Sequence, residues 1–464
     1  MHAFESLTRQ RQYSHLQNVV SLLGATAVLA GICVTPALAQ KPPVFADPVT
    51  FCTLGEENGD CIFSRPMGLV VAELVDLEGT SDDGYPDVAV VNTGGNPQSV
   101  TVFHNTGDWS DPGSALVRIG VFSLGVNQNP YDIKAGHMGN HLGDLPADEH
   151  LDLVITLGSG KVAILYNDQN GHGQFGNRED IPLETSGPMG LVVHDLDLDG
   201  RQDIAAGTFE IVFTHSEARV EVLWRQGDNT WDHDVIGEDH NMPWGTSTDI
   251  VAGSVAKKLL SPAFLDLVVA TAQYHVTLVN QGTNHQFGEA IWSESYATYP
   301  YGIVLGRFRT GVIPLDLAGG DCFDWPPCGD SVLVYWNNAY GRFDFNDWYE
   351  LQSGEQVGHD PYGLAVGKIN ADTKEDIVVG IGHDAPCSPG GGIGVFVGYG
   401  DGTFREPPYL FCVDPDGEPK PKFVKIADMD QDGFNDVVTS NHWDGHNISV
   451  LINSLQAIPP GGSP

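Results

Sequence analysis

The feature that most constrains this chain is a unit of about sixty residues that recurs seven times. Each unit opens on a proline before an apolar run, as in Pro66-Met67-Gly68. The seven prolines are Pro66, Pro130, Pro188, Pro243, Pro300, Pro361 and Pro421, spaced by 64, 58, 55, 57, 61 and 60 residues. A repeat of this length indicates one array of similar units rather than the roughly three separate domains that the chain length alone would suggest.

An aspartate heads a β-branched run in every unit. These residues are Asp87, Asp152, Asp203, Asp266, Asp316, Asp376 and Asp436. A further alternating run follows, such as SVTVF at 99–103, and in several units a Gly-x-Phe turn then precedes a fourth segment. Short β-branched segments between Gly, Asn and Asp turns are typical of strands. Four strands in each of seven units predict an all-β protein, a seven-bladed β-propeller of four-stranded antiparallel blades.

The two ends of the chain complement each other. The last unit stops after its third strand, at Leu451-Ile452-Asn453, while residues 45–52 (FADPVTFC) parallel residues 404–412 (FREPPYLFC), the fourth strand of the sixth unit. We therefore predict that residues 40–65 contain the strand that completes the last blade and closes the ring. Residues 66–454 would hold the seven repeats, and residues 455–464 would form a flexible tail.

Residues 1–39 have the pattern of a signal peptide. Arg9 and Arg11 precede a 16-residue apolar stretch, residues 19–34, and Ala37-Leu38-Ala39 supplies the small residues of a cleavage site. The alternative is a membrane anchor, but the stretch is shorter than the roughly 20 residues needed to span a bilayer. We expect a secreted protein, periplasmic or extracellular, with no transmembrane segment after cleavage near Ala39.

The charge balance excludes one class of partner. The full chain has 61 acidic and 22 basic residues, and without residues 1–39 the counts are 60 and 20, a net charge of −40. Nucleic acids and anionic membrane surfaces would be repelled by such a chain.

Taken together, the Pro-x-Gly, DxDxDG, Asp-apolar and Gly-x-Phe motifs resemble the FG-GAP (VCBS-type) repeat of integrin α-chain propellers and of many exported bacterial proteins. The resemblance extends over about residues 45–454. It implies a propeller with calcium-binding loops on one face. It leaves the biochemical role open, because the family includes adhesins, lectins and accessory modules of enzymes.

Two loops carry the full oxygen pattern of a calcium site. Positions 1, 3, 5 and 9 are aspartates, position 6 is glycine, and position 7 offers a backbone carbonyl. Hard oxygen donors at alternate positions suit Ca²⁺, although Asp-Gly sequences also favour plain turns. The predicted ligands of two structural calcium ions are Asp195, Asp197, Asp199, Arg201 and Asp203 in one loop, and Asp428, Asp430, Asp432, Phe434 and Asp436 in the other. A third site is possible at Asp76, Glu78, Asp82 and Asp87.

The opposite face is predicted to carry disulfides and ligand-binding loops. Six cysteines remain after cleavage, and of fifteen possible connectivities blade geometry favours Cys52 with Cys61, Cys322 with Cys328, and Cys387 with Cys412. Aromatic and histidine residues in the same loops are candidates for contacting a ligand. They are Trp325, His383, Asp384, His442, Trp443, Asp444 and His446.

Three classes of function are consistent with this sequence. The repeats use the whole mature chain, so we expect a binding module for an extracellular carbohydrate or protein, as in adhesion, rather than an enzyme. A polysaccharide lyase or hydrolase using His383, Asp384, His442 and Asp444 is the alternative, although neither G-x-S-x-G nor HExxH occurs. A structural component of a surface complex is the third.

Overall fold

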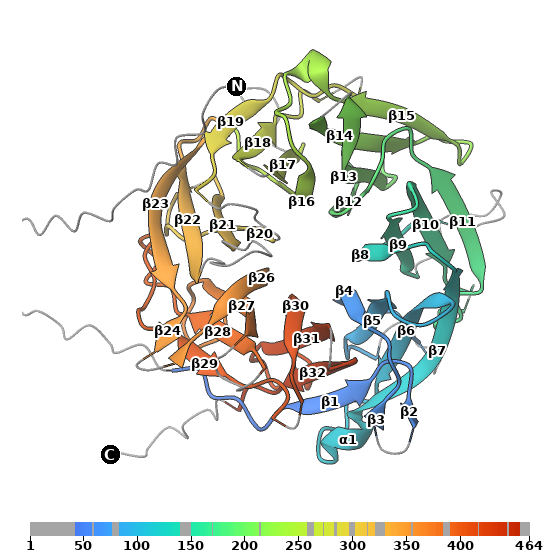
Figure 1. The fold of residues 1–464 in the computed structure, drawn as a ribbon, viewed down its shortest axis with the longest axis vertical. Helices are drawn as coiled ribbons and strands as arrows, with labels where there is room; N and C mark the ends of the chain where they lie inside the picture. Colours follow the sequence, from blue (N-terminus) through green and yellow to red (C-terminus); the bar gives the residue numbers. More distant parts are fainter. Residues whose placement is uncertain are drawn as a thin grey trace, which may run out of the picture. The chain divides into compact units, whose positions relative to one another are not determined.

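Four-stranded antiparallel sheets stand around a central axis like the blades of a propeller (Figure 1). The computed structural model describes residues 42–454 apart from short gaps at 58–59, 77–82, 140–149, 169, 213–214, 258–263, 272, 283–284, 297–301, 313, 321–329, 354–355, 384–389, 416 and 443–444. The predicted signal peptide and C-terminal tail lie outside these residues. In the part of the chain that is described, no helix has the length and apolar character needed to cross a bilayer.

Each blade is built from strands that are consecutive in the chain, apart from the last. Blades 1 to 3 are β4 (Pro66–Ala72), β5 (Asp87–Asn92), β6 (Gln98–Asn105) and β7 (Leu116–Gly125); β8 (Pro130–Gly136), β9 (Asp152–Leu157), β10 (Lys161–Tyr166) and β11 (Asn177–Pro182); and β12 (Leu191–His194), β13 (Asp203–Val212), β14 (His215–Arg225) and β15 (Trp231–Ile236). Blades 4 and 5 are β16 (Ser247–Gly253), β17 (Asp266–Thr271), β18 (Tyr274–Leu278) and β19 (Ile291–Glu294); and β20 (Ile303–Gly306), β21 (Asp316–Gly320), β22 (Ser331–Asn337) and β23 (Phe343–Glu350). Blades 6 and 7 are β26 (His359–Gly367), β27 (Asp376–His383), β28 (Gly392–Phe396) and β29 (Tyr409–Phe411); and β30 (Lys420–Ala427), β31 (Asp436–His442), β32 (Asn447–Leu451) and β1 (Val49–Cys52).

The remaining elements are small. They are the hairpins β2 (Glu56–Glu57) with β3 (Asp60–Cys61) and β24 (Gln352–Ser353) with β25 (Gln356–Val357), the one-turn helix α1 (Pro112–Ala115), and a 3-10 turn (Glu238–His240). The predicted all-β, seven-bladed architecture is confirmed, and every second strand of a blade begins at the aspartate that the sequence singled out.

Closure of the ring by the N-terminal strand is also confirmed. Strand β1 pairs antiparallel with β32, from Val49 opposite Val450 to Cys52 opposite Asn447. In Figure 1 the blue β1 lies beside the red β32, so the two ends of the described chain share one sheet. The third strand of the last blade thereby gains the fourth strand that its own repeat lacks, so the outer edge of blade 7 is the short strand β1.

The apolar core lies between the blades rather than within any one of them. Seven clusters of buried side chains occur among the described residues, one between each pair of neighbouring blades. In the cluster that closes the ring, Leu69 and Val88 of blade 1 pack with Val438 and Ile448 of blade 7. Because neighbouring blades cover both faces of each blade, the middle strands are buried on both sides, as in β5, where every residue from Asp87 to Asn92 is buried.

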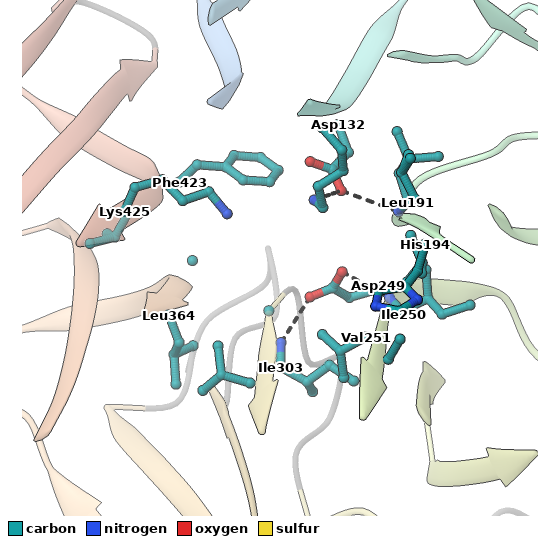
Figure 2. Close-up of a pocket in the computed structure, with 18 of the residues that line it drawn as sticks. Asp132, Leu191, His194, Asp249, Ile250, Val251, Ile303, Leu364, Phe423 and Lys425 are labelled. Atoms are coloured by element: carbon teal, nitrogen blue, oxygen red, sulfur yellow. Dashed lines mark hydrogen bonds and ion pairs between the residues drawn. The ribbon is translucent and has the colours of Figure 1, made fainter. Parts of the chain in front are cut away.

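The innermost strands approach one another closely, which explains the glycine of the Pro-x-Gly motif. A Cβ on Gly68 would lie 2.8 Å from the Cα of Asp132, and a Cβ on Gly190 would lie 2.8 Å from the Cα of Asp249. Asp132 and Asp249 occupy the corresponding positions of blades 2 and 4, four residues before the end of the first strand. Each carboxylate accepts a hydrogen bond from the next blade, Asp132 from the Leu191 amide (3.2 Å) and Asp249 from the Ile303 amide (2.9 Å), as Figure 2 shows.

One landmark of the repeat is displaced. The sequence assigned Pro243-Trp244-Gly245 to the start of blade 4, but β16 begins at Ser247, and Asp249 holds the place of the motif glycine. In blades 1, 2, 6 and 7 the proline lies inside the first strand. The displacement frees the Pro243 segment to form part of a surface pocket.

Candidate functional site

The two acidic loops lie between the first and second strands of blades 3 and 7. Their backbones follow the same course: Leu198 and Gly200 in one, and Gln431 and Gly433 in the other, all have positive φ. Glycine adopts this conformation without strain, which is why position 6 of the motif is glycine. In both loops the amide of that glycine donates to the first aspartate, from Gly200 to Asp195 at 2.9 Å and from Gly433 to Asp428 at 3.0 Å.

The carboxylates of each loop converge. Asp195, Asp197 and Asp203 each offer an oxygen within 4.8 Å of the others, and so do Asp428, Asp430 and Asp432. The Oδ1 atom of Asp428 is buried and accepts no hydrogen bond from any described residue. Burial of a carboxylate oxygen without a donor is costly, and oxygen donors in this arrangement are those that Ca²⁺ prefers.

The electrostatics of the loops favour positive charge. Burial, together with the carboxylates of Asp197 and Asp199, raises the pKa of Asp203 to about 7 although two backbone amides donate to it. Burial and neighbouring carboxylates likewise raise the pKa of Asp436 to about 8. Two side chains already supply partial compensation in blade 3, where Arg201 pairs with Asp199 and the Nε2 of His285 lies 3.0 Å from Asp197.

The ninth loop position has a role in every blade that the sequence analysis missed. In blade 7, Asp436 accepts hydrogen bonds from the Met429 amide (2.6 Å), in its own loop, and from the Asn453 amide (2.7 Å), after the third strand. The same double acceptance of backbone amides occurs in five other blades, at Asp87, Asp152, Asp203, Asp266 and Asp376. In blade 5, Asp316 accepts the Asn337 amide and the guanidinium of Arg309. The aspartate therefore recurs in all seven blades because its hydrogen bonds join the loop to the end of the third strand, whether or not the loop has the calcium motif. Calcium ligation at Asp203 and Asp436 would use lone pairs that these bonds leave over.

The other loops lack this complete pattern. In blade 5 the guanidinium of Arg309 makes two contacts of 3.0 and 2.6 Å with Asp316, so a positively charged side chain stands beside that carboxylate. In blade 1, Asp76 is buried and Asp87 contacts His104 at 3.1 Å. Glu78 and Asp82, the other two candidates of the possible third site, lie outside the described residues.

Three of the predicted ligand residues on the opposite face are described, and they lie in blades 6 and 7. His383 lies at the end of β27, with its Nε2 3.2 Å from Asp360 and 3.2 Å from the Lys420 ammonium. His442 ends β31 and is buried, and burial lowers its pKa to about 3. The ring of His446 packs edge-on against Phe63. Trp325, Asp384, Trp443 and Asp444 are outside the described residues.

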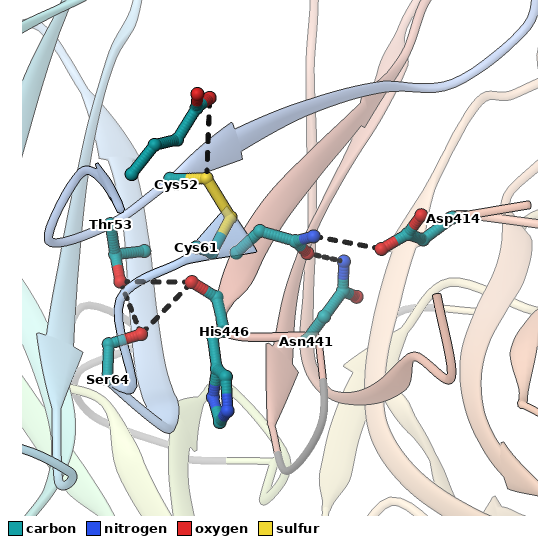
Figure 3. Close-up of a disulfide and its surroundings, with 9 residues drawn as sticks. Cys52, Thr53, Cys61, Ser64, Asp414, Asn441 and His446 are labelled. Atoms are coloured by element: carbon teal, nitrogen blue, oxygen red, sulfur yellow. Dashed lines mark hydrogen bonds between the residues drawn. A yellow bond between two sulfur atoms is a disulfide. The ribbon is translucent and has the colours of Figure 1, made fainter. Parts of the chain in front are cut away.

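The disulfide Cys52–Cys61 is present and joins the closing strand to the loop that follows it. Figure 3 shows it beside Thr53 and Ser64, whose hydroxyls both contact the His446 carbonyl (3.4 and 3.0 Å). These bonds attach the N-terminal segment to the β31–β32 loop of blade 7. Cys412 is also disulfide-bonded. Its predicted partner Cys387 lies outside the described residues, as do Cys322 and Cys328.

An aromatic pocket between blades 3 and 4 was missed by the sequence analysis. It has a volume of about 330 Å³ and lies on the face of the β13–β14 and β17–β18 loops. Its lining residues are Glu217, Asn241, Met242, Pro243, Trp244, Gln273, Tyr274 and Trp292. The sequence motif placed Trp244 in the first strand of blade 4, and Trp292 lies in β19, the fourth strand of that blade. Neither tryptophan was therefore recognised as a residue of a binding loop.

The walls of this aromatic pocket are fixed by backbone hydrogen bonds. The Ala218 amide donates to the Pro243 carbonyl (3.1 Å), and the Gly245 amide donates to the Ser216 carbonyl (2.8 Å), which holds the Trp244 segment against β14. Trp244 is 71% exposed and stacks at a tilt on His215, with ring centroids 4.7 Å apart. On the opposite wall of the pocket, the ring centroids of Tyr274 and Trp292 lie 4.9 Å apart. The Trp292 indole donates a hydrogen bond to the Asn241 carbonyl (2.8 Å).

The fold and the acidic loops define the class of protein: a seven-bladed β-propeller with Asp-rich hairpin loops on one face. A family model described as an FG-GAP-like repeat matches residues 144–206, which include the loop from Asp195 to Asp203. This match and the seven-bladed architecture fit an FG-GAP-type propeller, as the sequence motifs predicted. No curated protein shows significant sequence similarity to the chain.

Solved structures that resemble this one are distant in sequence. A crystal structure of BBS1N in complex with ARL6DN matches with a TM-score of 0.52 and 11% identity, covering 90% of this chain and 99% of that chain. The Dos1 propeller matches with a TM-score of 0.49 and 8% identity, covering 86% and 80%. A protein from Bacteroides uniformis described as a putative 6-phosphogluconolactonase matches with a TM-score of 0.45 and 10% identity, covering 78% and 94%. At 11% identity the match to BBS1N supports the propeller fold alone. The other two matches have TM-scores below 0.5, and we draw nothing from them.

Proposed function

We propose that this protein is an exported, calcium-stabilised binding propeller that takes a carbohydrate in the aromatic pocket between blades 3 and 4. The observation that carries the proposal is the indole of Trp244, 71% exposed at the mouth of a pocket whose other wall is Tyr274 and Trp292. Single exposed aromatic side chains are common on protein surfaces, but aromatic side chains gathered around one pocket are typical of a ligand-binding site.

The chemistry of the pocket suits a sugar ring. The apolar C–H face of a pyranose packs on indole and phenol rings, while its hydroxyls need donors and acceptors at the edges. Gln273 and Asn241 lie among the lining residues, and the side-chain amide of each offers both a hydrogen-bond donor and an acceptor. The Glu217 carboxylate is oriented by Arg219, at 2.5 Å, and by His215, at 3.1 Å. A volume of about 330 Å³ is at the small end of ligand sites and fits one or two sugar units rather than a buried oligosaccharide.

Calcium in the loops of blades 3 and 7 would stabilise the face opposite this pocket. The converging carboxylates, the buried Oδ1 of Asp428 and the raised pKa values of Asp203 and Asp436 all support a bound cation there. Such a cation binds the folded state and not the unfolded one, so its binding adds to stability. The Cys52–Cys61 disulfide supports the export part of the proposal, because disulfides persist in oxidising compartments.

A glycan array tests the ligand directly. We expect the purified protein to retain a defined set of glycans, the variant Trp244→Ala to lose them, and the control Trp348→Ala, which removes an indole that is 56% exposed in blade 5, to keep them. Both tryptophans are exposed, so neither change should shift stability by more than about 0.5 kcal/mol. Equal retention by the two variants would show that the pocket is not the site. If no glycan is retained, the carbohydrate assignment is wrong, and release of sugar products would instead indicate an enzyme.

A further inference from the structure

A charged cavity lies on the propeller axis, separate from both the acidic loops and the aromatic pocket. It has a volume of about 340 Å³ and is lined by the first strands of blades 2 to 7, which Figure 2 shows converging around it. The strands concerned are β8, β12, β16, β20, β26 and β30. Because each strand belongs to a different blade, the walls of the cavity are held by the ring as a whole.

Positive charge is concentrated in this cavity. Lys134, Lys422 and Lys425 line it, three of only 22 basic residues in a chain with 61 acidic ones. Two carboxylates accompany them, Asp132 and Asp249. With all five groups ionised the cavity carries a net charge of +1, the opposite sign to the chain.

The five charged groups are not equally compensated. The Lys134 ammonium lies 2.5 Å from Asp132, and the Lys422 ammonium lies over the ring of Tyr362, 3.0 Å from its centroid. The two carboxylates also accept backbone amides of the next blade, from Leu191 and Ile303. The Lys425 ammonium forms no hydrogen bond or ion pair with any residue that the structure describes.

The surroundings of Lys425 oppose its charge. Burial lowers the pKa of the Lys425 ammonium to about 8, and the nearby Lys134 ammonium contributes to the shift, while Asp132 and Asp249 act in the opposite sense. Burial raises the pKa of Asp249 to about 6, and the Asp132 carboxylate adds to that shift. A partly desolvated ammonium is stabilised by an anion in direct contact with it, and no carboxylate of the described residues forms an ion pair with Lys425.

The remaining walls are apolar. Leu191, Val251, Ile303, Leu364 and Phe423 line the cavity between the charged groups. A fully hydrated inorganic ion would gain nothing from these side chains, whereas an organic ion would bury an apolar body against them. We propose that the channel is a binding site for a small organic carboxylate, whose carboxylate group pairs with Lys425 and whose apolar body packs on the aliphatic side chains of the inner strands.

Benzoate is a suitable probe, with benzamide as the neutral control of the same shape. Calorimetry should detect benzoate binding to the full-length protein and none of benzamide, and benzoate alone should raise the melting temperature. The variant Lys425→Met keeps the aliphatic stem and removes the charge, so it should weaken benzoate binding about tenfold or more. Lys161→Met, which removes a surface lysine paired with Asp180, should leave binding unchanged.

A second readout guards against a folding defect. Because the Lys425 ammonium lacks a partner, Lys425→Met should raise the melting temperature of the unliganded protein while abolishing the further rise with benzoate. Equal binding of benzoate and benzamide, no binding of either at millimolar concentration, or unchanged binding to Lys425→Met would each overturn the proposal. Trp244→Ala should not affect benzoate binding, so this result is independent of the carbohydrate proposal.

Discussion

The side-chain amide of Asn453 donates a hydrogen bond of 2.6 Å to the carbonyl of Ile369, which belongs to the loop of the preceding blade. The backbone amide of the same asparagine donates to Asp436 in its own blade. Four other blades repeat the pair of bonds, through Asn105 to Met429, Asn167 to Leu74, Asn280 to Leu196 and Asn337 to Val255. An asparagine at or just after the end of the third strand thus connects each of these blades to its neighbour.

Loss of one such connection should weaken the whole ring. In Asn337→Ala the carbonyls of Val255 and Leu315 lose their side-chain donor, and the Ala339 amide loses its acceptor. We expect the free energy of unfolding to fall by about 2 kcal/mol, because buried backbone groups are left without partners. Urea denaturation measures this, and Asn177→Ala, at an exposed position of β11, is the control with a change of at most about 0.5 kcal/mol. A loss no larger than in the control would contradict the structural role of Asn337.

Calcium should stabilise the protein through two loops. EDTA is expected to lower the melting temperature, and calorimetry in calcium should give two sites, with one lost in Asp197→Asn and the other in Asp430→Asn. Asp372→Asn in blade 6 is the matched control, because that loop has Lys368 at the first position, where the two complete motifs have Asp195 and Asp428. An unchanged melting temperature in EDTA would sink the calcium hypothesis.

Without calcium, the acidic loops should make stability depend on pH. The pKa of Asp436 is raised to about 8 in the folded state from an ordinary value of 3.8, so the folded state binds a proton that the unfolded state has released. The contribution of this proton to the free energy of unfolding is complete below about pH 4 and is lost as the pH rises through about 8. In EDTA, the wild type should therefore lose stability relative to Asp436→Asn between these values, as measured by urea denaturation at several pH values. Parallel curves for the two proteins would show that Asp436 does not titrate in this range.

A histidine in blade 4 should act in the opposite direction. Both ring nitrogens of His275 are buried and without hydrogen bonds among the described residues, and burial lowers the pKa of His275 to about 3 from 6.5. Its stabilising contribution is present above pH 6.5 and is lost as the pH falls toward 3, since the unfolded state takes up the proton first. We expect the free energy of unfolding of His275→Leu to increase relative to that of the wild type by up to about 1.4 kcal/mol for each pH unit below 6.5. Thermal unfolding at several pH values measures this difference. The control His137→Leu, at an exposed position, should show no such gain.

The closing strand should depend on its disulfide. Replacement of both Cys52 and Cys61 by serine removes a crosslink over nine residues, which we expect to lower the free energy of unfolding by about 2 to 3 kcal/mol. Proteolysis near residue 60 should become faster in the same variant, because the crosslink restrains the segment after β1. A double variant with unchanged stability would show that the strand pairing with β32 is sufficient by itself.

Much of the fold could be predicted from the sequence because it repeats. Seven aspartates before β-branched runs located the second strands to the residue, and the likeness of residues 45–52 to residues 404–412 identified the closing strand. These signals are local, since strand propensity, turn residues and a period can be recognised without knowing which blades touch. Trp244 shows the limit: its Pro-Trp-Gly setting matched the repeat, and only the register of β16 showed that it lies outside the strand.

The sequence by itself determined the number of blades, their strands, the ring closure and the two loops with the full set of acidic residues. The tertiary structure alone decided which side chains from different blades meet: the asparagine connections, the Trp244 pocket with Trp292, and the lysines and aspartates on the axis. The physical reason is that these contacts join residues tens to hundreds of positions apart, whose distances depend on how the blades pack. A residue such as Lys425 has the same local sequence signals as any strand lysine, and its place in the channel follows from the closed ring.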